Sequence, residues 1–76
     1  MLDTTIPAAR RVRPLARALE EASAAGVPRW AVAEEAGISQ ALLSMLARGR
    51  TPVTDASAEA VARALGRPVR DLFPER

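Results

Sequence analysis

Four glycines and six prolines divide this 76-residue chain into short segments, and they limit its fold more than any other feature. The glycines at 26, 37, 49 and 66 each follow a run rich in alanine or leucine. A glycine suits the left-handed backbone that ends a helix, and a proline is tolerated in a helix's first turn. No stretch alternates apolar and polar residues as a strand does. The spacing predicts an all-α, compact bundle of about five short helices.

The apolar residues between these breaks recur at helical spacing. Ser39 and Thr54 have the side chains that cap helix starts, and Glu59 and Arg63 are spaced to pair on one helix face. We expect residues 1–12 to form an N-terminal arm, and 13–76 to form one domain. The predicted helices cover residues 14–25, 28–36, 39–48, 55–65 and 69–73.

Several residue types are missing, and their absence excludes whole classes of function. The chain has no His, Cys, Lys or Tyr, so most catalytic nucleophiles and bases are lacking. The usual ligands of zinc and iron are absent as well, and no disulfide can form. We therefore expect no enzyme activity, no metal and no cofactor. With no apolar run of 18 residues and no signal peptide, we expect a cytoplasmic protein without a membrane segment.

The most informative stretch runs from residue 31 to 50. Ala33 is small where two helices would cross, and four residues later Gly37 supplies a turn. Leu43 and Leu46 follow at the spacing that would pack the second helix against the first. A helix, a short turn containing glycine and a second helix form the helix-turn-helix pattern.

With these residues the chain resembles the Cro and phage-repressor-type (Xre-like) helix-turn-helix family, which has the lambda-repressor-like fold. The resemblance covers residues 14–73, nearly the whole chain. It implies a sequence-specific regulator of transcription, a repressor of bacterial or phage origin that binds double-stranded DNA. The matching pieces are VAEEAGIS at 32–39, LLSMLARGR at 42–50, Pro52, Thr54, AVARALG at 60–66 and VRDLF at 69–73.

Three positions depart from the family pattern. Arg29 stands where many members carry a glutamine that approaches the phosphates and braces the recognition helix. Ala47 stands where many carry a glutamate paired with an arginine of the first helix. Pro52 comes one residue earlier than usual. The brace and the ion pair of the family are therefore not expected in this chain.

Charge is unevenly placed along the chain, although the net charge is only +2. Residues 18–35 carry four glutamates and one arginine, whereas residues 36–54 carry two arginines and no acid. A surface that approaches DNA phosphates favours arginine and disfavours carboxylates. The acid-free window coincides with the expected recognition helix, about 39–48, and the loop after it.

Within this window, residue chemistry selects the expected DNA contacts. Gln40 matches the adenine edge in the major groove, and Ala41 and Met45 match thymine methyl groups. Arg48 and Arg50 can bind phosphates, or can serve as ordinary cations at a helix end. We expect Trp30 to pack, partly buried, against the first helix. The expected DNA-binding residues are Arg29, Ser39, Gln40, Ala41, Leu42, Ser44, Met45, Arg48, Arg50 and Thr51.

The resemblance also implies a homodimer on an inverted-repeat operator. Val69, Leu72 and Phe73 near the end of the chain are the candidates for its interface, with Leu72 also suited to closing the chain's own core. Two other functions stay open. One is the antitoxin of a toxin–antitoxin pair, which shares the fold and also binds DNA. The other is a protein-interaction module without DNA binding.

Overall fold

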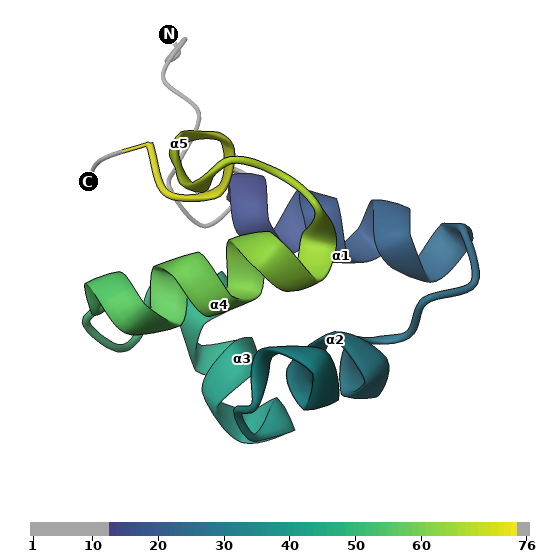
Figure 1. Cartoon of the computed structure of the whole chain (residues 1–76), viewed down its shortest axis with the longest axis horizontal. Coiled ribbons are helices and arrows are strands. Elements are labelled where there is room, and N and C mark those ends of the chain that lie inside the picture. The colour runs from purple at the N-terminus through teal and green to yellow at the C-terminus, as the bar shows by residue number, and fades with distance from the viewer. Residues whose placement is uncertain (1–12, 75–76) are drawn as a thin grey trace, which may run out of the picture.

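The computed structural model describes residues 13–74, which contain helices and no strand. In Figure 1, α1 and α4 cross the middle of the molecule, α2 and α3 lie below them, and α5 lies above. The predicted all-α fold of five helices is confirmed for this range, while the arm expected over 1–12 lies outside the described residues. The helices are α1 (Pro14–Ala24), α2 (Arg29–Ala36), α3 (Gln40–Arg48), α4 (Asp55–Leu65) and α5 (Val69–Leu72).

Short-range hydrogen bonds fix where two helices begin. The Leu42 backbone N–H donates to the Ser39 hydroxyl oxygen at 3.0 Å, which caps α3 as predicted. At α4, the Ser57 backbone N–H donates to the Thr54 hydroxyl oxygen at 3.1 Å, and the Thr54 backbone N–H donates to the Ser57 hydroxyl oxygen at 3.2 Å. This reciprocal capping box satisfies N–H groups that have no partner inside the helix.

All five helices border one apolar core. The most extensive packing is that of α2 against α4, while α1 packs against α3 and α5 at the other side of the core. The described chain buries no charged or polar residue, so the core is held together by apolar contact alone. Its members are Leu15, Ala18, Leu19, Val32, Ala33, Leu43, Leu46, Ala47, Ala58, Val61, Ala62, Leu72 and Phe73.

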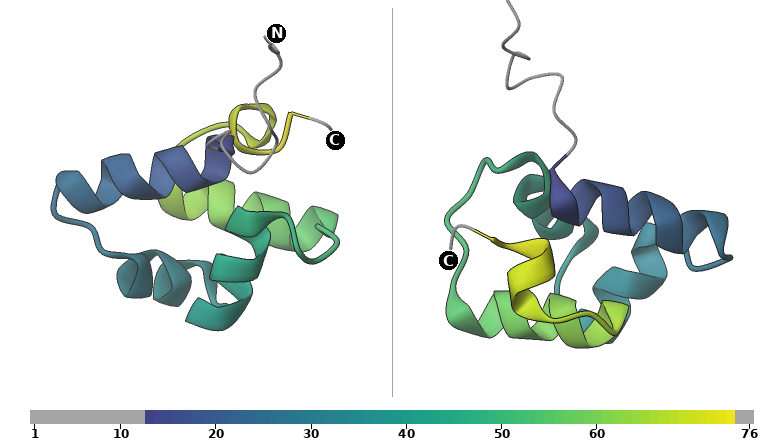
Figure 2. Two further views of the ribbon diagram at one scale, coloured as in Figure 1. Left: turned by 180° about the vertical axis from the view of Figure 1, so that it is seen from behind. Right: turned by 90° about the horizontal axis from the view of Figure 1, so that it is seen from above.

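The last helix closes this core. Seen from above in Figure 2, α5 lies between α1 and α4, and it packs against both. Leu72 is 3% exposed and Phe73, just past the end of α5, is 5% exposed. Val69 is half-buried and packs against the same core. Leu72 thus closes the chain's own core, which is one of the two roles expected for it, and Phe73 is buried in the same core instead of being available for the expected interface.

Ion pairing on the surface differs from the expectation. Arg67, in the turn before α5, pairs with Glu21 of α1, two exposed side chains far apart in sequence. Within the described range, no hydrogen bond or ion pair joins Glu59 to Arg63, so that prediction is wrong. The physical reason is that exposed pairs gain little over the entropy lost in fixing two long side chains.

Candidate nucleic-acid interface

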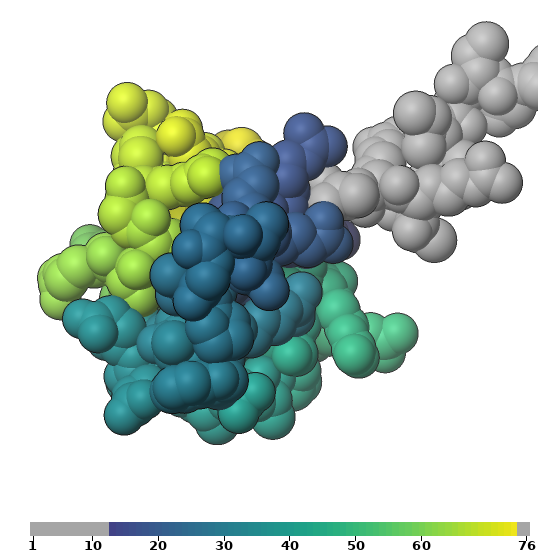
Figure 3. Space-filling view, turned by 90° about the vertical axis from the view of Figure 1, so that its right-hand side faces the viewer, coloured from purple at the N-terminus to yellow at the C-terminus, as the bar shows by residue number. Residues whose placement is uncertain are grey.

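A tight turn sets α3 against α2. Gly37 adopts the left-handed conformation, with φ 74°, and so ends α2. The Ile38 backbone N–H then donates to the Ala33 carbonyl at 3.0 Å, and Ile38 itself packs against the core. Ala33 is 2% exposed, as expected for a small residue between crossing helices. In Figure 3 the teal surface of α2 and α3 forms the lower part of the molecule.

This arrangement gives α3 a buried face and an outward face. Leu43, Leu46 and Ala47 are buried. The outward residues span an arc of about 140° at 100° per residue, as an amphipathic helix requires. Its exposed members are Gln40, Ala41, Met45 and Arg48, with half-buried Ser44 among them.

Two hydrophobic residues of α3 have different positions relative to the core. Met45 is 41% exposed, which is unusual for a large apolar side chain on a helix with a complete core face. Leu42 is half-buried and packs against the core, so it marks the border of the outward face. Ala47 is 3% exposed, and a glutamate at this position would have to leave the core.

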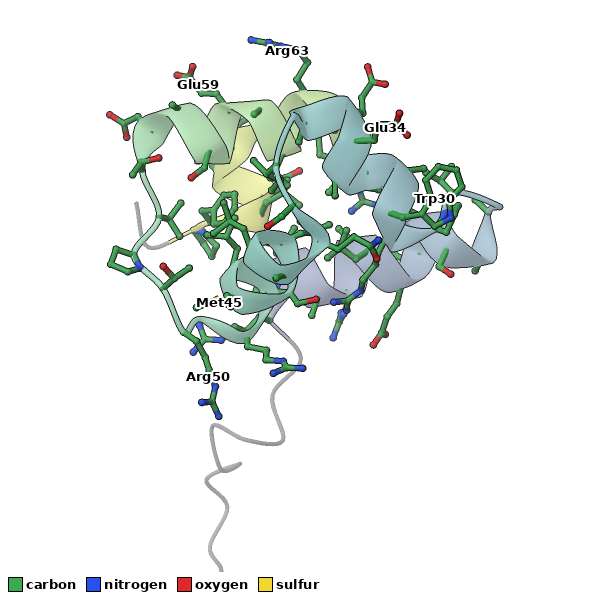
Figure 4. The ribbon with its side chains drawn as sticks, turned by 90° about the horizontal axis from the view of Figure 1, so that it is seen from below. Trp30, Glu34, Met45, Arg50, Glu59 and Arg63 are labelled. Atoms are coloured by element: carbon green, nitrogen blue, oxygen red, sulfur yellow. The ribbon has the colours of Figure 1, made fainter. Side chains whose placement is uncertain are left out.

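Positive charge gathers where α3 ends. Arg48 lies in the last turn of α3, and Arg50 follows in the loop; both are exposed. Figure 4 shows Met45 and Arg50 on one side of the molecule, with Glu59 and Arg63 on the opposite side. Because residues 36–54 contain no acid, no carboxylate of this stretch offsets that charge.

The start of α2 supplies a further group of donors. Arg29 is half-buried at the first position of α2, and Pro28 before it provides no side-chain cap. In the described range, the backbone N–H groups of Arg29 and Trp30 have no hydrogen-bond acceptor. Open N–H groups at the positive end of a helix dipole favour an anion such as a phosphate.

Trp30 does not occupy the place expected from the sequence. Its side chain is 55% exposed, and Figure 4 shows it at the edge of the molecule, away from Met45 and Arg50. The helical period explains this, because Trp30 lies about 110° from the middle of the face formed by Val32, Ala33 and Ala36. That periodicity could have identified Trp30 as a surface residue.

Arg13 is not among the DNA-binding residues expected from the sequence, but the structure brings it to the end of α3. Its guanidinium lies directly against Gly49, in the space that a Cβ atom at position 49 would occupy. Thr51, in the loop after α3, is half-buried and lines a surface hollow together with Arg13 and Gly49. Only the three-dimensional structure reveals this contact, because it joins distant parts of the chain.

The structure thus brings most of the expected DNA-binding residues to one side. Gln40, Ala41, Met45 and Arg48 share the outward face of α3, and Arg50 follows it. The described helices include none long and apolar enough to cross a membrane. Between residues 13 and 74, no three metal-binding side chains gather at one place.

Comparison with known proteins gives one match. A family model described as helix-turn-helix, of the Cro and phage-repressor type, matches residues 26–72, more than half of the chain. The matched range begins just before α2 and ends with α5. No curated protein and no solved structure matches the chain.

Proposed function

Because this chain belongs to the Xre-like helix-turn-helix family of DNA-binding regulators, we propose that it recognises a specific double-stranded DNA sequence and represses transcription. This family is not a family of enzymes. The observation that carries the proposal is the outward face of α3. It presents an amide, the apolar side chains of Ala41 and Met45, and a terminal arginine, in a stretch of chain without acid.

In this proposal α3 enters the major groove. Gln40 reads a base edge near the start of the helix, and Ala41 and Met45 contact thymine methyl groups. Ser44 lies on the same face, between Gln40 and Ala41 around the helix, and would reach a base or a phosphate. These contacts would determine which sequence is bound.

Other groups would hold the protein in register on the phosphate backbone without reading sequence. They lie at both ends of the helix-turn-helix, where arginines or polar groups are accessible. Arg29 and the open N–H groups of α2 would bind one stretch of backbone. Arg48, Arg50 and Thr51 would bind another. The Ser39 hydroxyl oxygen already accepts the hydrogen bond that caps α3, so Ser39 would contact a phosphate by donating its hydroxyl hydrogen.

We also propose that the protein binds an inverted-repeat operator as a homodimer. It would act in the bacterial cytoplasm and would be encoded by a bacterium or by a phage. One short recognition helix reads few base pairs, and a symmetric pair doubles the site. Since the core uses Leu72 and Phe73, another surface would join the two copies.

Selection of bound DNA from a random pool tests the proposal. We expect an enriched inverted repeat, with half-sites about one helical turn apart. Failure to enrich any sequence at low salt would contradict sequence-specific binding. Enrichment of a single unrepeated half-site would contradict the homodimer only.

An antitoxin is the second candidate function, and exposed apolar residues favour it. Val27, in the segment before α2, is 42% exposed, and Trp30, in the first turn of α2, is 55% exposed. Large exposed apolar side chains are typical of protein-binding surfaces. Co-purification with the product of an adjacent gene, abolished by Trp30→Ser without loss of DNA binding, would support this function.

A further inference from the structure

A hollow opens on the molecule beside, and not on, the outward face of α3. It lies between the start of α1, the end of α3 with its following loop, and α5, and has a volume of about 350 Å³. Volumes in this range are found for the smaller pockets that hold organic molecules. The hollow therefore has room for a compact ligand of low molecular weight.

The walls of the hollow are mainly apolar. Leu46 and Phe73 belong to the buried core and reach the hollow from α3 and from the end of α5. Val53 is half-buried and forms the side given by the loop. An apolar body placed here would be removed from water, which is the main favourable term in binding of this kind.

Arg13 is the one charged group among residues 13–74 that line this hollow. The guanidinium of Arg13 lies against Gly49, and both residues line the hollow. Among residues 13–74, no carboxylate oxygen lies within ion-pair distance of Arg13. The hollow thus combines apolar walls with an exposed positive charge that has no protein counter-ion in the described range.

We propose that this hollow binds a small carboxylate that carries a compact apolar body, such as an aromatic ring. A guanidinium presents two parallel N–H groups that match the two oxygens of a carboxylate. The ring would lie against Leu46, Val53 and Phe73, with the carboxylate at Arg13. The hydroxyl of Thr51, which lines the hollow as well, is a further donor for the carboxylate.

The composition of the lining decides between ligand classes. A polyphosphate or a nucleotide needs several cations, and among the described residues of the lining Arg13 alone is charged. A cation would meet repulsion from Arg13 and no acid. A neutral apolar molecule would leave the guanidinium without a partner, so a single carboxylate is the charge that fits.

Titration of the full ¹⁵N-labelled chain with phenylacetate, followed by NMR, tests this proposal. We expect saturable shifts at millimolar concentrations in the backbone signals of Gly49 and Thr51, and none at Gly26, which does not line the hollow. Phenylacetamide has the same ring and no charge, so it should bind about tenfold more weakly or worse.

Substitutions of two exposed arginines, Arg13 just before α1 and Arg17 in its first turn, distinguish a specific site from general electrostatic attraction. Arg13→Gln should weaken phenylacetate binding by about tenfold or more, because it removes the charged hydrogen-bond donor. Arg17→Gln removes the same charge from a residue that does not line the hollow, so affinity should stay unchanged.

Three results would overturn the proposal. The first is no saturable binding in the full chain, which would mean that the hollow is closed to ligands. The second is equal binding of phenylacetate and phenylacetamide. The third is an equal loss in Arg13→Gln and Arg17→Gln, which would mean that overall charge, and not this hollow, attracts the anion.

Discussion

Arg13 and Gly49 fit together so closely that the guanidinium of one occupies the space where the other would carry a side chain. A Cβ atom built on Gly49 would lie 2.5 Å from Cζ of Arg13. Gly49 also has φ 71°, in the left-handed region that side chains disfavour. Glycine at position 49 is thus favoured by its own backbone conformation, and it also leaves room for the guanidinium of Arg13.

These two restrictions differ in cost. In Gly49→Ala, the guanidinium is the end of a flexible and exposed side chain, so it can move away at little cost. We expect the free energy of unfolding to fall by about 1–2 kcal/mol, the cost of a left-handed alanine. Urea denaturation of the purified variant measures this change.

Gly37→Ala is the matched control for this prediction. Its φ is 74°, and nothing lies within 4 Å of the added Cβ. The two variants should therefore lose similar stability. A loss in Gly49→Ala larger by more than about 1 kcal/mol, beyond the backbone cost, would show that Arg13 is held rigidly in place.

Leu43 and Met45 lie two residues apart on α3 but belong to its two different faces. Leu43 is 0% exposed, and Leu43→Ala should cost about 2–5 kcal/mol, much of the roughly 4–11 kcal/mol expected for a domain of this length. Met45 is 41% exposed, so Met45→Ala should change stability by less than about 0.5 kcal/mol. Thermal unfolding monitored by circular dichroism checks both. A comparable loss of stability in Met45→Ala would show that Met45 packs in the core.

Arg50 should bind DNA of any sequence through a phosphate. Arg50→Ala is expected to lower affinity on specific and random duplexes alike, and to reduce the salt slope by about 0.9, as for one phosphate contact. Fluorescence anisotropy at several salt concentrations measures the slope. Arg63→Ala is the control, because Arg63 lies on the opposite side of the molecule and its removal changes the net charge equally. Identical slopes for both variants would refute a phosphate contact by Arg50.

Gln40 should contribute to sequence recognition. Gln40→Ala is expected to weaken binding to the selected operator by about 1–3 kcal/mol, because a paired base edge loses its amide partner. Affinity for a random duplex should hardly change. Competition between the two duplexes gives the ratio of operator affinity to random-duplex affinity directly. If this ratio is the same in Gln40→Ala as in the unchanged chain, Gln40 does not read a base.

Trp30 is the chain's single tryptophan, and its 55% exposure makes it a local reporter. Trp30→Ala should change the free energy of unfolding by less than about 0.5 kcal/mol, as for other surface substitutions. In the unchanged chain, we expect fluorescence emission typical of a solvated indole, shifting when DNA covers the start of α2. A destabilisation near that of Leu43→Ala would show that the indole is buried.

The parts of the fold that depend on neighbouring residues could be predicted from the sequence. Ser39 caps α3 and Thr54 caps α4 because each hydroxyl bonds a residue three positions ahead. Gly37 and Gly49 end helices through their own backbone conformation. The outward face of α3 likewise follows from spacing within a single helix, since the buried residues fix its orientation.

Two of the differences from the sequence predictions concern contacts between elements that are distant in sequence. The burial of Phe73 depends on α5 lying between α1 and α4, which no local pattern specifies. The contact of Arg13 with Gly49 has the same origin. The exposure of Trp30 is a local property, because the helical period alone turns this residue away from the buried face that includes Val32.

The packing of α1 against α5 has a consequence for how the molecule folds. These are the first and the last helices of the described chain, and the core residues Leu15 and Leu72 belong to one cluster. Bringing such distant segments together costs loop-closure entropy. Helices that form one at a time do not offset this cost, because the contacts between α1 and α5 form only when both are in place. The chain should therefore fold in one cooperative step. A partly folded form would not position α3 for binding. Each molecule in a population would therefore be either fully folded and able to bind DNA, or unfolded and unable to bind it.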